Sequence, residues 1–119
     1  MIFYQLFSHN PEIVRCHAGE YLFNEGEDGD RMYVLASGQA EVLLNNEVVE
    51  TTGSGDIVGE LAVIEPGPRS ASVRACCDCE FVAIDQKRFD YLVSQTPNFA
   101  THVMRIMARR LRRTNRKIH

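Results

Sequence analysis

Residues 55–75 read GDIVGELAVIEPGPRSASVRA, and this stretch decides how the rest of the chain is interpreted. Residues 59–64 can form one or two turns of helix. Residues 65–68, Glu-Pro-Gly-Pro, must end that helix, because proline cannot continue it and glycine permits a tight reversal. Arg69 follows at once, and residues 70–75 resume as a strand. The pattern therefore predicts an arginine that returns beside the start of a short helix.

This arrangement favours a negatively charged ligand. A helix N-terminus has free N–H groups and the positive end of a dipole, which together suit a phosphate. Arg69 adds a permanent charge whose donors match phosphate oxygens. Glu60, in the first helical turn, is placed to accept a hydrogen bond from a sugar hydroxyl. The alternative is a surface loop in which Glu60 and Arg69 form an ordinary ion pair.

The whole string resembles the phosphate-binding cassette of cyclic nucleotide-binding domains. The family pattern is F-G-E-L-A-L-I, three variable residues ending in proline, and then R-A-A-T or R-S-A. The matching positions are Gly59, Glu60, Leu61, Ala62, Ile64, Pro68, Arg69 and Ala71, whereas Val58 replaces the usual Phe. The resemblance implies that Arg69 pairs with the cyclic phosphate and that Glu60 holds the ribose 2′-hydroxyl. The implied ligand-binding residues of the cassette are Gly59, Glu60, Leu61, Arg69, Ser70 and Ala71, with backbone N–H groups completing the cradle.

Upstream of the cassette, short apolar runs alternate with glycine-rich breakers. The runs are 13–17, 21–23, 32–36, 40–44 and 48–52, and the breakers are 18–20, 26–30, 37–38, 45–46 and 53–55. Many short strands with glycine turns predict a sandwich or barrel. Asn45-Asn46 predicts a two-residue primed turn, since asparagine tolerates positive φ.

Two upstream segments extend the resemblance. Residues 19–30 resemble the family's G-E-x-I-F-x-E-G-D-x-G-D, and residues 31–42 resemble x-L-Y-x-I-x-x-G-x-V-x-V. The implied fold is mainly β with flanking helices. It is a double-stranded β-helix, a jelly-roll-like β-roll over about residues 12–84, followed by two C-terminal helices of which the last is long.

The spacing of the apolar residues changes after the strand expected at residues 79–84. Asp85 predicts an N-cap for a helix over about 86–95, and Thr96-Pro97 predicts the start of a second helix over about 97–117. Its apolar stripe includes Val103, Ile106, Met107, Leu111, Thr114 and Ile118. A small roll cannot bury so long a stripe, so part of it is expected to meet a partner. Residues 1–8 are apolar and aromatic and are expected to form a short helix on the body.

The last helix also carries a resemblance. Residues 107–114 resemble M-A-R-R-L-x-x-T in the long helix of bacterial catabolite-activator-type regulators, which dimerises in parallel. By position, Arg110 and Thr114 would reach the adenine, which implies cyclic AMP as the preferred ligand and a homodimer through this helix. Asn115 departs from the family's frequent serine. Cyclic GMP is the alternative ligand, because the Ser70 hydroxyl is placed to accept a guanine.

Charge is divided unevenly along the chain. All sixteen acidic residues lie between Glu12 and Asp90, whereas seven of the thirteen basic residues lie from Arg105 onward. Such asymmetry can indicate a nucleic-acid or acidic partner. The alternative is a solvated helix face that offsets the acidic body. The basic end has no recognition helix and no interleaved aromatic residues, so we expect no sequence-specific DNA binding by this chain alone.

The chain lacks the residue clusters of an enzyme. The four histidines, His9, His17, His102 and His119, are scattered, and no nucleophile–base pair stands out. The run from Cys76 to Cys79 resembles a metal loop, but only three thiols gather there and no histidine lies nearby. We therefore expect reduced, free thiols, no catalytic residue, no metal and no cofactor. A remaining alternative is an interaction domain that keeps the β-roll and binds no nucleotide.

Length and composition indicate one domain. A chain of 119 residues can build a single core. It contains no run of about eighteen apolar residues, and its N-terminus lacks the features of a signal peptide. We expect residues 1–119 to form one cytoplasmic cyclic nucleotide-binding domain, without a DNA-binding domain. It would act alone or as the sensor part of a transcription regulator.

Overall fold

Two antiparallel four-stranded sheets form the body of the computed structural model, which describes residues 10–118, with side chains up to Arg113. The first sheet has the order β1-β10-β4-β7, and the second has the order β2-β9-β5-β6. The first comprises β1 (Glu12–Cys16), β10 (Cys79–Ile84), β4 (Met32–Ser37) and β7 (Ile57–Val58). The second comprises β2 (Tyr21–Phe23), β9 (Ser72–Ala75), β5 (Ala40–Leu44) and β6 (Glu47–Thr52). A third, two-stranded sheet pairs β3 (Asp28–Gly29) with β8 (Gly67–Pro68).

The space between the two sheets is filled by apolar side chains. One cluster contains Phe23, Leu35, Val58, Val73 and Phe81, all buried. In β4, Leu35 belongs to this cluster, whereas Met32 and Val34 belong to a second cluster on the other side of the sheet. The alternation follows from the two-residue period of a strand. The central strands β4 and β10 are therefore covered on both faces.

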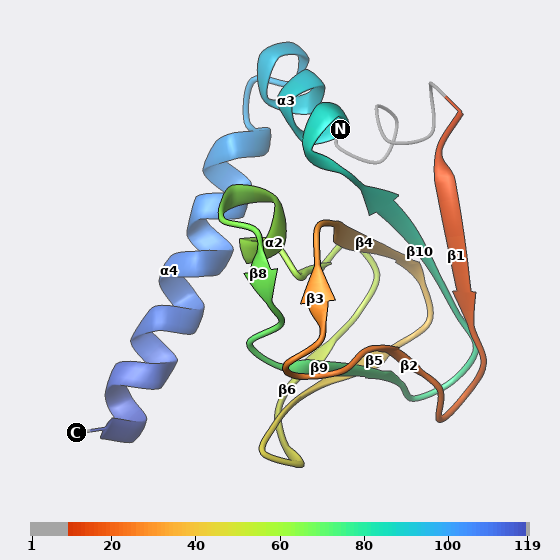
Figure 1. The fold of residues 1–119 in the computed structure, drawn as a ribbon, viewed down its shortest axis with the longest axis vertical. Coiled ribbons are helices and arrows are strands. Elements are labelled where there is room, and N and C mark those ends of the chain that lie inside the picture. The colour runs from red at the N-terminus through yellow and green to blue at the C-terminus, as the bar shows by residue number, and fades with distance from the viewer. Residues whose placement is uncertain (1–9, 119) are drawn as a thin grey trace.

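The second cluster is where the helices dock. Helix α3 (Gln86–Gln95) and helix α4 (Phe99–Ile118) contribute Leu92, Phe99, Val103 and Ile106 to it. Figure 1 shows α3 at one end of the roll and α4 running along its flank, past the short helix α2 (Leu61–Ile64). The first half of α4 is thus part of the core, and the second half of the helix passes the cassette.

The predicted fold class is confirmed: a mainly β roll is followed by two C-terminal helices, the last one long. Asn45 and Asn46 have φ values of 53° and 65°, as the predicted primed turn requires. The long helix begins at Phe99 and not at Pro97. Thr96 ends α3, and its carbonyl accepts the Phe99 amide at 3.1 Å in an intervening turn. The helix expected over residues 1–8 lies outside the described residues.

Candidate functional site

A hollow of about 540 Å³, part of it open to solvent, lies between the cassette, the second sheet and α4. Its apolar wall is made by Phe23, Val42, Val58 and Val73. Its polar groups come mainly from the cassette and from Arg110 on α4, so it has both surfaces that a nucleotide needs.

Arg69 is fixed at this hollow by its backbone. Its amide donates to the Glu27 carbonyl at 2.7 Å, and its carbonyl accepts the Gly26 amide at 2.9 Å. Its side chain is only 8% exposed and donates from Nη1 to the Arg31 carbonyl at 2.8 Å. The loop of residues 26–31 therefore holds both ends of Arg69.

Close packing sets the orientation of the Arg69 guanidinium. It stacks on Phe23, with Cζ 4.0 Å from the ring centroid, a cation–π contact. A Cβ on Gly29 would lie 2.2 Å from Arg69 Nε, and a Cβ on Gly59 would lie 2.7 Å from Nη1. Gly59 also has a φ of 73°, which side chains rarely adopt. Because Gly29 and Gly59 have no side chain, the guanidinium of Arg69 fits in the space beside them.

Arg69 has no carboxylate partner within ion-pair distance among residues 10–113. Its Nε is buried and makes no hydrogen bond there. Burial lowers the pKa of Arg69, and the charges of Tyr33, Asp30 and Glu27 only partly offset that effect. A desolvated cation with an unused donor is suited to bind an anion that enters the hollow.

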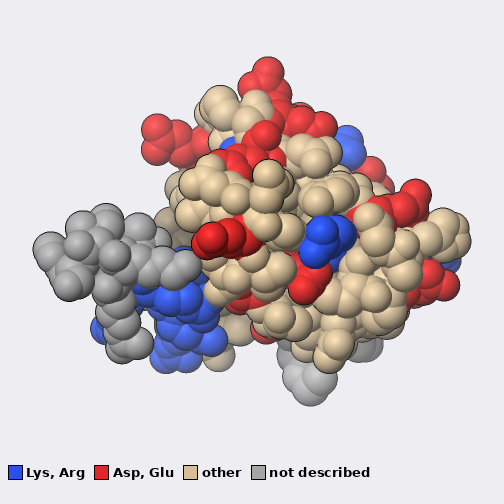
Figure 2. Space-filling model, turned by 90° about the horizontal axis from the view of Figure 1, so that it is seen from below, with Lys and Arg blue, Asp and Glu red and all other residues tan. Residues whose placement is uncertain are grey.

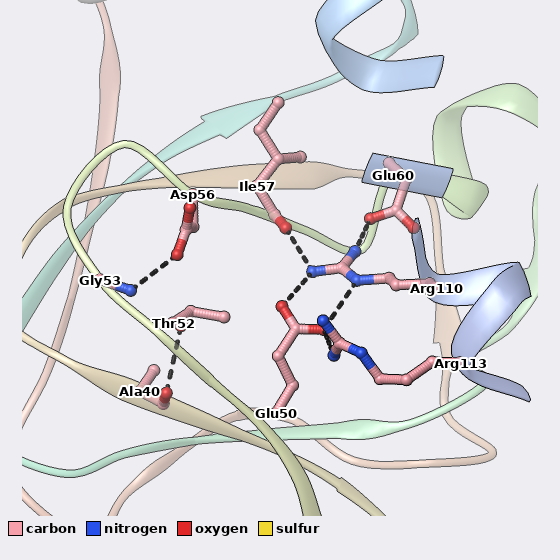
Figure 3. Close-up of polar contacts among 9 residues, drawn as sticks. All are labelled: Ala40, Glu50, Thr52, Gly53, Asp56, Ile57, Glu60, Arg110 and Arg113. Atoms are coloured by element: carbon pink, nitrogen blue, oxygen red, sulfur yellow. Dashed lines mark hydrogen bonds and ion pairs between the residues drawn. The ribbon is translucent and has the colours of Figure 1, made fainter. Parts of the chain in front are cut away.

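Glu60 is 5% exposed, and its charge is met by a different arginine. Arg110 donates from Nη1 to Glu60 Oε1. Figure 3 shows Arg110 reaching from α4 between Glu60 of the cassette and Glu50 of β6. The alternative interpretation of the cassette, an ordinary Glu60–Arg69 ion pair, is therefore wrong.

Glu50 binds Arg110 more extensively than Glu60 does. Arg110 Nε and Nη2 lie 3.2 Å from Glu50 Oε1 and Oε2, and Nη2 also donates to the Ile57 carbonyl at 2.8 Å. Arg113 Nη1 donates to Glu50 Oε1 at 2.8 Å. Burial alone would raise the pKa of Glu50, but hydrogen bonds and charge from the two arginines lower it overall. Burial would lower the pKa of Arg110, and Glu50 and Glu60 together raise it.

The structure brings seven of the eight predicted site residues to one hollow: Gly59, Glu60, Leu61, Arg69, Ser70, Ala71 and Arg110. Leu61 and Ser70 are exposed, and Ala71 is half-buried. Within the described chain, the backbone amides of Gly59, Glu60, Ser70 and Ala71 donate no turn or loop hydrogen bond. Thr114 belongs to α4, one turn beyond Arg110, and its side chain lies outside the description. Ligand contact by all eight residues stays a prediction.

Sequence reasoning missed Glu50, Gly29 and Phe23. Gly29 lies in a segment that was expected to supply only a turn, and Phe23 in a strand with no assigned role. Glu50 has no local signal, because its contact with Arg110 joins residues sixty positions apart. The family resemblance could have marked Gly29 and Phe23, since both fall within its upstream pattern.

The four cysteines lie away from the hollow. All four cysteines are free, with Cys16 and Cys79 buried and Cys76 and Cys77 exposed. Burial raises the pKa of the Cys16 and Cys79 thiols and so keeps both protonated. No helix in the described part of the chain is long and apolar enough to cross a bilayer.

Comparison with known proteins places these features in a family. The profile described as the cyclic nucleotide-binding domain matches residues 13–96. A CRP-like cAMP-activated global transcriptional regulator from Mycobacterium tuberculosis is 31% identical over 105 residues. That match covers 84% of this chain and 47% of the regulator. The chain thus spans about half the length of that curated relative.

Solved structures agree with the profile. The catabolite activator protein of Thermus thermophilus superposes with a TM-score of 0.84 at 24% identity, over 98% of this chain and 56% of that chain. At that identity the likeness shows the fold alone. The structure described as cAMP bound PfPKA-R (141-441) superposes with a TM-score of 0.78 at 30% identity, over 89% of this chain and 36% of that chain.

Proposed function

The chain belongs to the cyclic nucleotide-binding domain family, a family of regulatory modules, and we propose that it binds cyclic AMP in the hollow at Arg69 and signals through α4. Arg69 carries the proposal. It is a buried cation with an unused Nε and no carboxylate partner among the described residues. A cyclic phosphate supplies the missing negative charge and the acceptor oxygens.

The other polar groups of the hollow suit the rest of a nucleotide. Glu60 lies beside Arg69 on the same short segment, and a ribose hydroxyl can donate to it. The apolar wall of Val42, Val58 and Val73 suits the uncharged faces of sugar and base. We assign the adenine end to Arg110 and Thr114 by their place on α4, with cyclic AMP preferred over cyclic GMP.

Helix α4 is the proposed output of the site. Its apolar stripe changes from buried at Val103 and Ile106 to exposed at Leu111, which is 62% exposed. Two copies packed in parallel would cover this surface about a two-fold axis. Figure 2 shows a group of Lys and Arg at the lower left of the molecule. Among the described side chains of α4, the exposed arginines are Arg105, Arg109, Arg112 and Arg113. Their mutual repulsion opposes a parallel dimer, so salt should strengthen it.

We assign this chain no chemical reaction and no sequence-specific DNA contact of its own. A regulatory role in the cytoplasm is the proposed setting, either alone or as the sensor of a transcription regulator. The M. tuberculosis relative, described as cAMP-activated, supports that reading, and 47% of its length is matched by this chain.

Calorimetric titration with cyclic AMP and cyclic GMP tests the ligand. We expect saturable one-to-one binding of both and tighter binding of cyclic AMP. Equal or tighter binding of cyclic GMP overturns the base preference. Absence of heat and of competition for both nucleotides overturns the proposed function and favours an interaction domain that binds no nucleotide.

Sedimentation of the full chain and of a chain ending near Arg105 tests the output, with and without cyclic AMP at two salt concentrations. We expect a weak dimer that cyclic AMP tightens, and a shortened chain that is monomeric and binds more weakly. If both chains are monomers throughout and bind equally well, α4 does not transmit the signal.

A further inference from the structure

Aromatic rings hold the guanidinium of Arg69 by its flat face. Its Cζ lies over the Phe23 ring, 4.0 Å from the centroid, and 5.8 Å from the centroid of the Tyr33 ring. The two rings are themselves neighbours, with centroids 6.0 Å apart. The face of an aromatic ring carries partial negative charge, so this pair supplies part of the charge that Arg69 does not receive from a carboxylate.

Contact through the face leaves the edge of the guanidinium for other partners. The N–H donors of an arginine lie in the plane of the guanidinium. A carboxylate would take two of them, whereas a ring stacked on the plane takes none. Nη1 donates to the Arg31 carbonyl at 2.8 Å, and Nε makes no hydrogen bond with any described residue. The stacked arginine is therefore held in place while it keeps a donor for a phosphate.

The loop of residues 26–31, which holds Arg69, also contains carboxylates that would compete for these donors. Glu27 and Asp30 are close enough for their charges to raise the pKa of Arg69, against the larger lowering by burial. Neither of these two forms an ion pair with Arg69. Glu27 Oε1 accepts the Asn24 amide at 2.7 Å, whereas the Asp30 side chain is exposed. Asp30 is thus the acid better placed to pair with Arg69 if the stacking were lost.

We propose that Phe23 is a positioning residue of the nucleotide site: its ring keeps the guanidinium of Arg69 away from Asp30, so that the edge of the guanidinium stays open for a phosphate. This inference rests on the proposed function, because it needs a phosphate at Arg69. An aliphatic side chain at position 23 would fill the core but has no negative face to hold the charge. The guanidinium would then pair with Asp30, and a phosphate would have to displace that carboxylate.

The test measures the affinity for cyclic AMP by calorimetry in Phe23→Leu, in Asp30→Asn and in the double variant. Loss of a cation–π contact should make Phe23→Leu bind about three- to thirtyfold more weakly. Asp30→Asn should gain little in the wild-type protein. In the double variant it should restore most of the loss, because no carboxylate at position 30 then competes with the phosphate. A purely structural role of Phe23 would not be rescued by a change of charge on an exposed residue.

Two control variants accompany these measurements. Asp28→Asn removes another exposed carboxylate of the same loop, but the charges that act on Arg69 include Asp30 and not Asp28. It should therefore not rescue Phe23→Leu. Phe81→Leu removes a fully buried ring of the same core cluster that does not line the hollow. It should lower stability and leave the affinity for cyclic AMP unchanged.

Trifluorophenylalanine at position 23 provides a second variant, and it serves if Phe23→Leu does not fold. It keeps an aromatic ring of similar shape, and its fluorine atoms reduce the negative charge on the ring face. We expect weaker binding of cyclic AMP here too, again with rescue by Asp30→Asn. The apolar contact of the ring with a ligand is retained, so its loss cannot explain the weakening.

Each outcome decides the inference. Wild-type affinity in the Phe23 variants would overturn it. A loss of affinity that Asp30→Asn does not restore, or that Asp28→Asn restores equally well, would also overturn it. These results leave the proposed function intact, because the wild-type protein still binds cyclic AMP. If the wild-type protein binds neither cyclic AMP nor cyclic GMP, the proposed function and this inference both fail.

Discussion

Arg69 and Arg110 line the same hollow from different elements, and their electrostatic surroundings are opposite. Arg69 is 8% exposed, stacks on an aromatic ring, and meets no carboxylate within the described chain. The Arg110 side chain is 24% exposed and is held by two carboxylates and a carbonyl. A buried charge without a partner costs folding free energy, whereas a paired charge cannot be removed without leaving its partners unpaired. The two arginines should therefore respond oppositely to truncation.

Arg69→Leu should have the largest effect, and it should appear in ligand binding. Truncation of a charge that faces a desolvated phosphate costs about 2–5 kcal/mol. This corresponds to a roughly 30- to 4,000-fold loss of affinity for cyclic AMP by calorimetry. The free energy of unfolding without ligand should stay level or rise, because leucine removes an unpaired buried charge.

The control for this variant is Arg15→Leu, which removes an exposed arginine of β1 paired with Glu80. It should bind cyclic AMP as the wild type does. A folded Arg69→Leu protein that binds within about threefold of the wild type would contradict the assignment of Arg69 to the phosphate.

Arg110→Leu should lower stability where Arg69→Leu does not. It leaves Glu60 without a cation and Glu50 with Arg113 alone. Because the site is partly open to water, we expect the free energy of unfolding to fall by about 1–3 kcal/mol in urea. Adding Glu60→Gln should restore part of that loss. An unchanged urea midpoint would show that α4 does not depend on this ion pair.

Gly29→Ala tests the room left for Arg69. The new methyl group would lie 2.2 Å from Arg69 Nε, so the guanidinium must move. Overpacking of this kind costs about 1–3 kcal/mol, and we expect roughly tenfold weaker binding of cyclic AMP. Gly53→Ala is the control, because nothing lies within 4 Å of its Cβ position. Equal binding by both variants would show that Arg69 can bind phosphate from another position.

Lowering the pH should weaken the ion pair between Glu50 and Arg110. We expect this effect on stability to be smaller than those of the substitutions above. The pKa of Glu50 is lowered from 4.5 in the folded state, so its contribution to stability is complete above that value. It is lost as the pH falls through the lowered pKa. Urea denaturation from about pH 6 to about pH 3 should show a steeper decline for the wild type than for Glu50→Gln. Parallel curves would contradict a role for the Glu50 charge in stability.

The sequence indicates the cassette well because its chemistry is local. Glu60 and Arg69 lie nine positions apart, and the Pro-Gly-Pro run between them forces the reversal that brings both to one hollow. The short apolar runs separated by glycine-rich breakers likewise predict a sandwich or barrel, since each run and its turn are local in the chain. These features depend on residues that are neighbours in the chain.

The features that were missed depend on contacts across the fold. Strands β3 and β8 are two residues long and read as turns, because only their mutual pairing at Asp28–Pro68 and Gly29–Gly67 makes them strands. The register of β6 and the path of α4 bring Glu50 into contact with Arg110, which lies sixty positions later in the chain. Thr96 has the residue type of an N-cap, but its Oγ1 is buried and makes no hydrogen bond with any described residue, so it caps no helix there.

Arg110 joins three parts of the molecule: the cassette, β6 and α4. Thermodynamic linkage is reciprocal, so if an occupied hollow holds α4 against the roll, then holding α4 there tightens the hollow by the same factor. A partner that pulls α4 away from the roll would act as an inhibitor, and a partner that presses α4 against β6 would act as an activator. Neither partner would contact the nucleotide. If α4 is the output of the site, as we propose, the same linkage makes it an input as well.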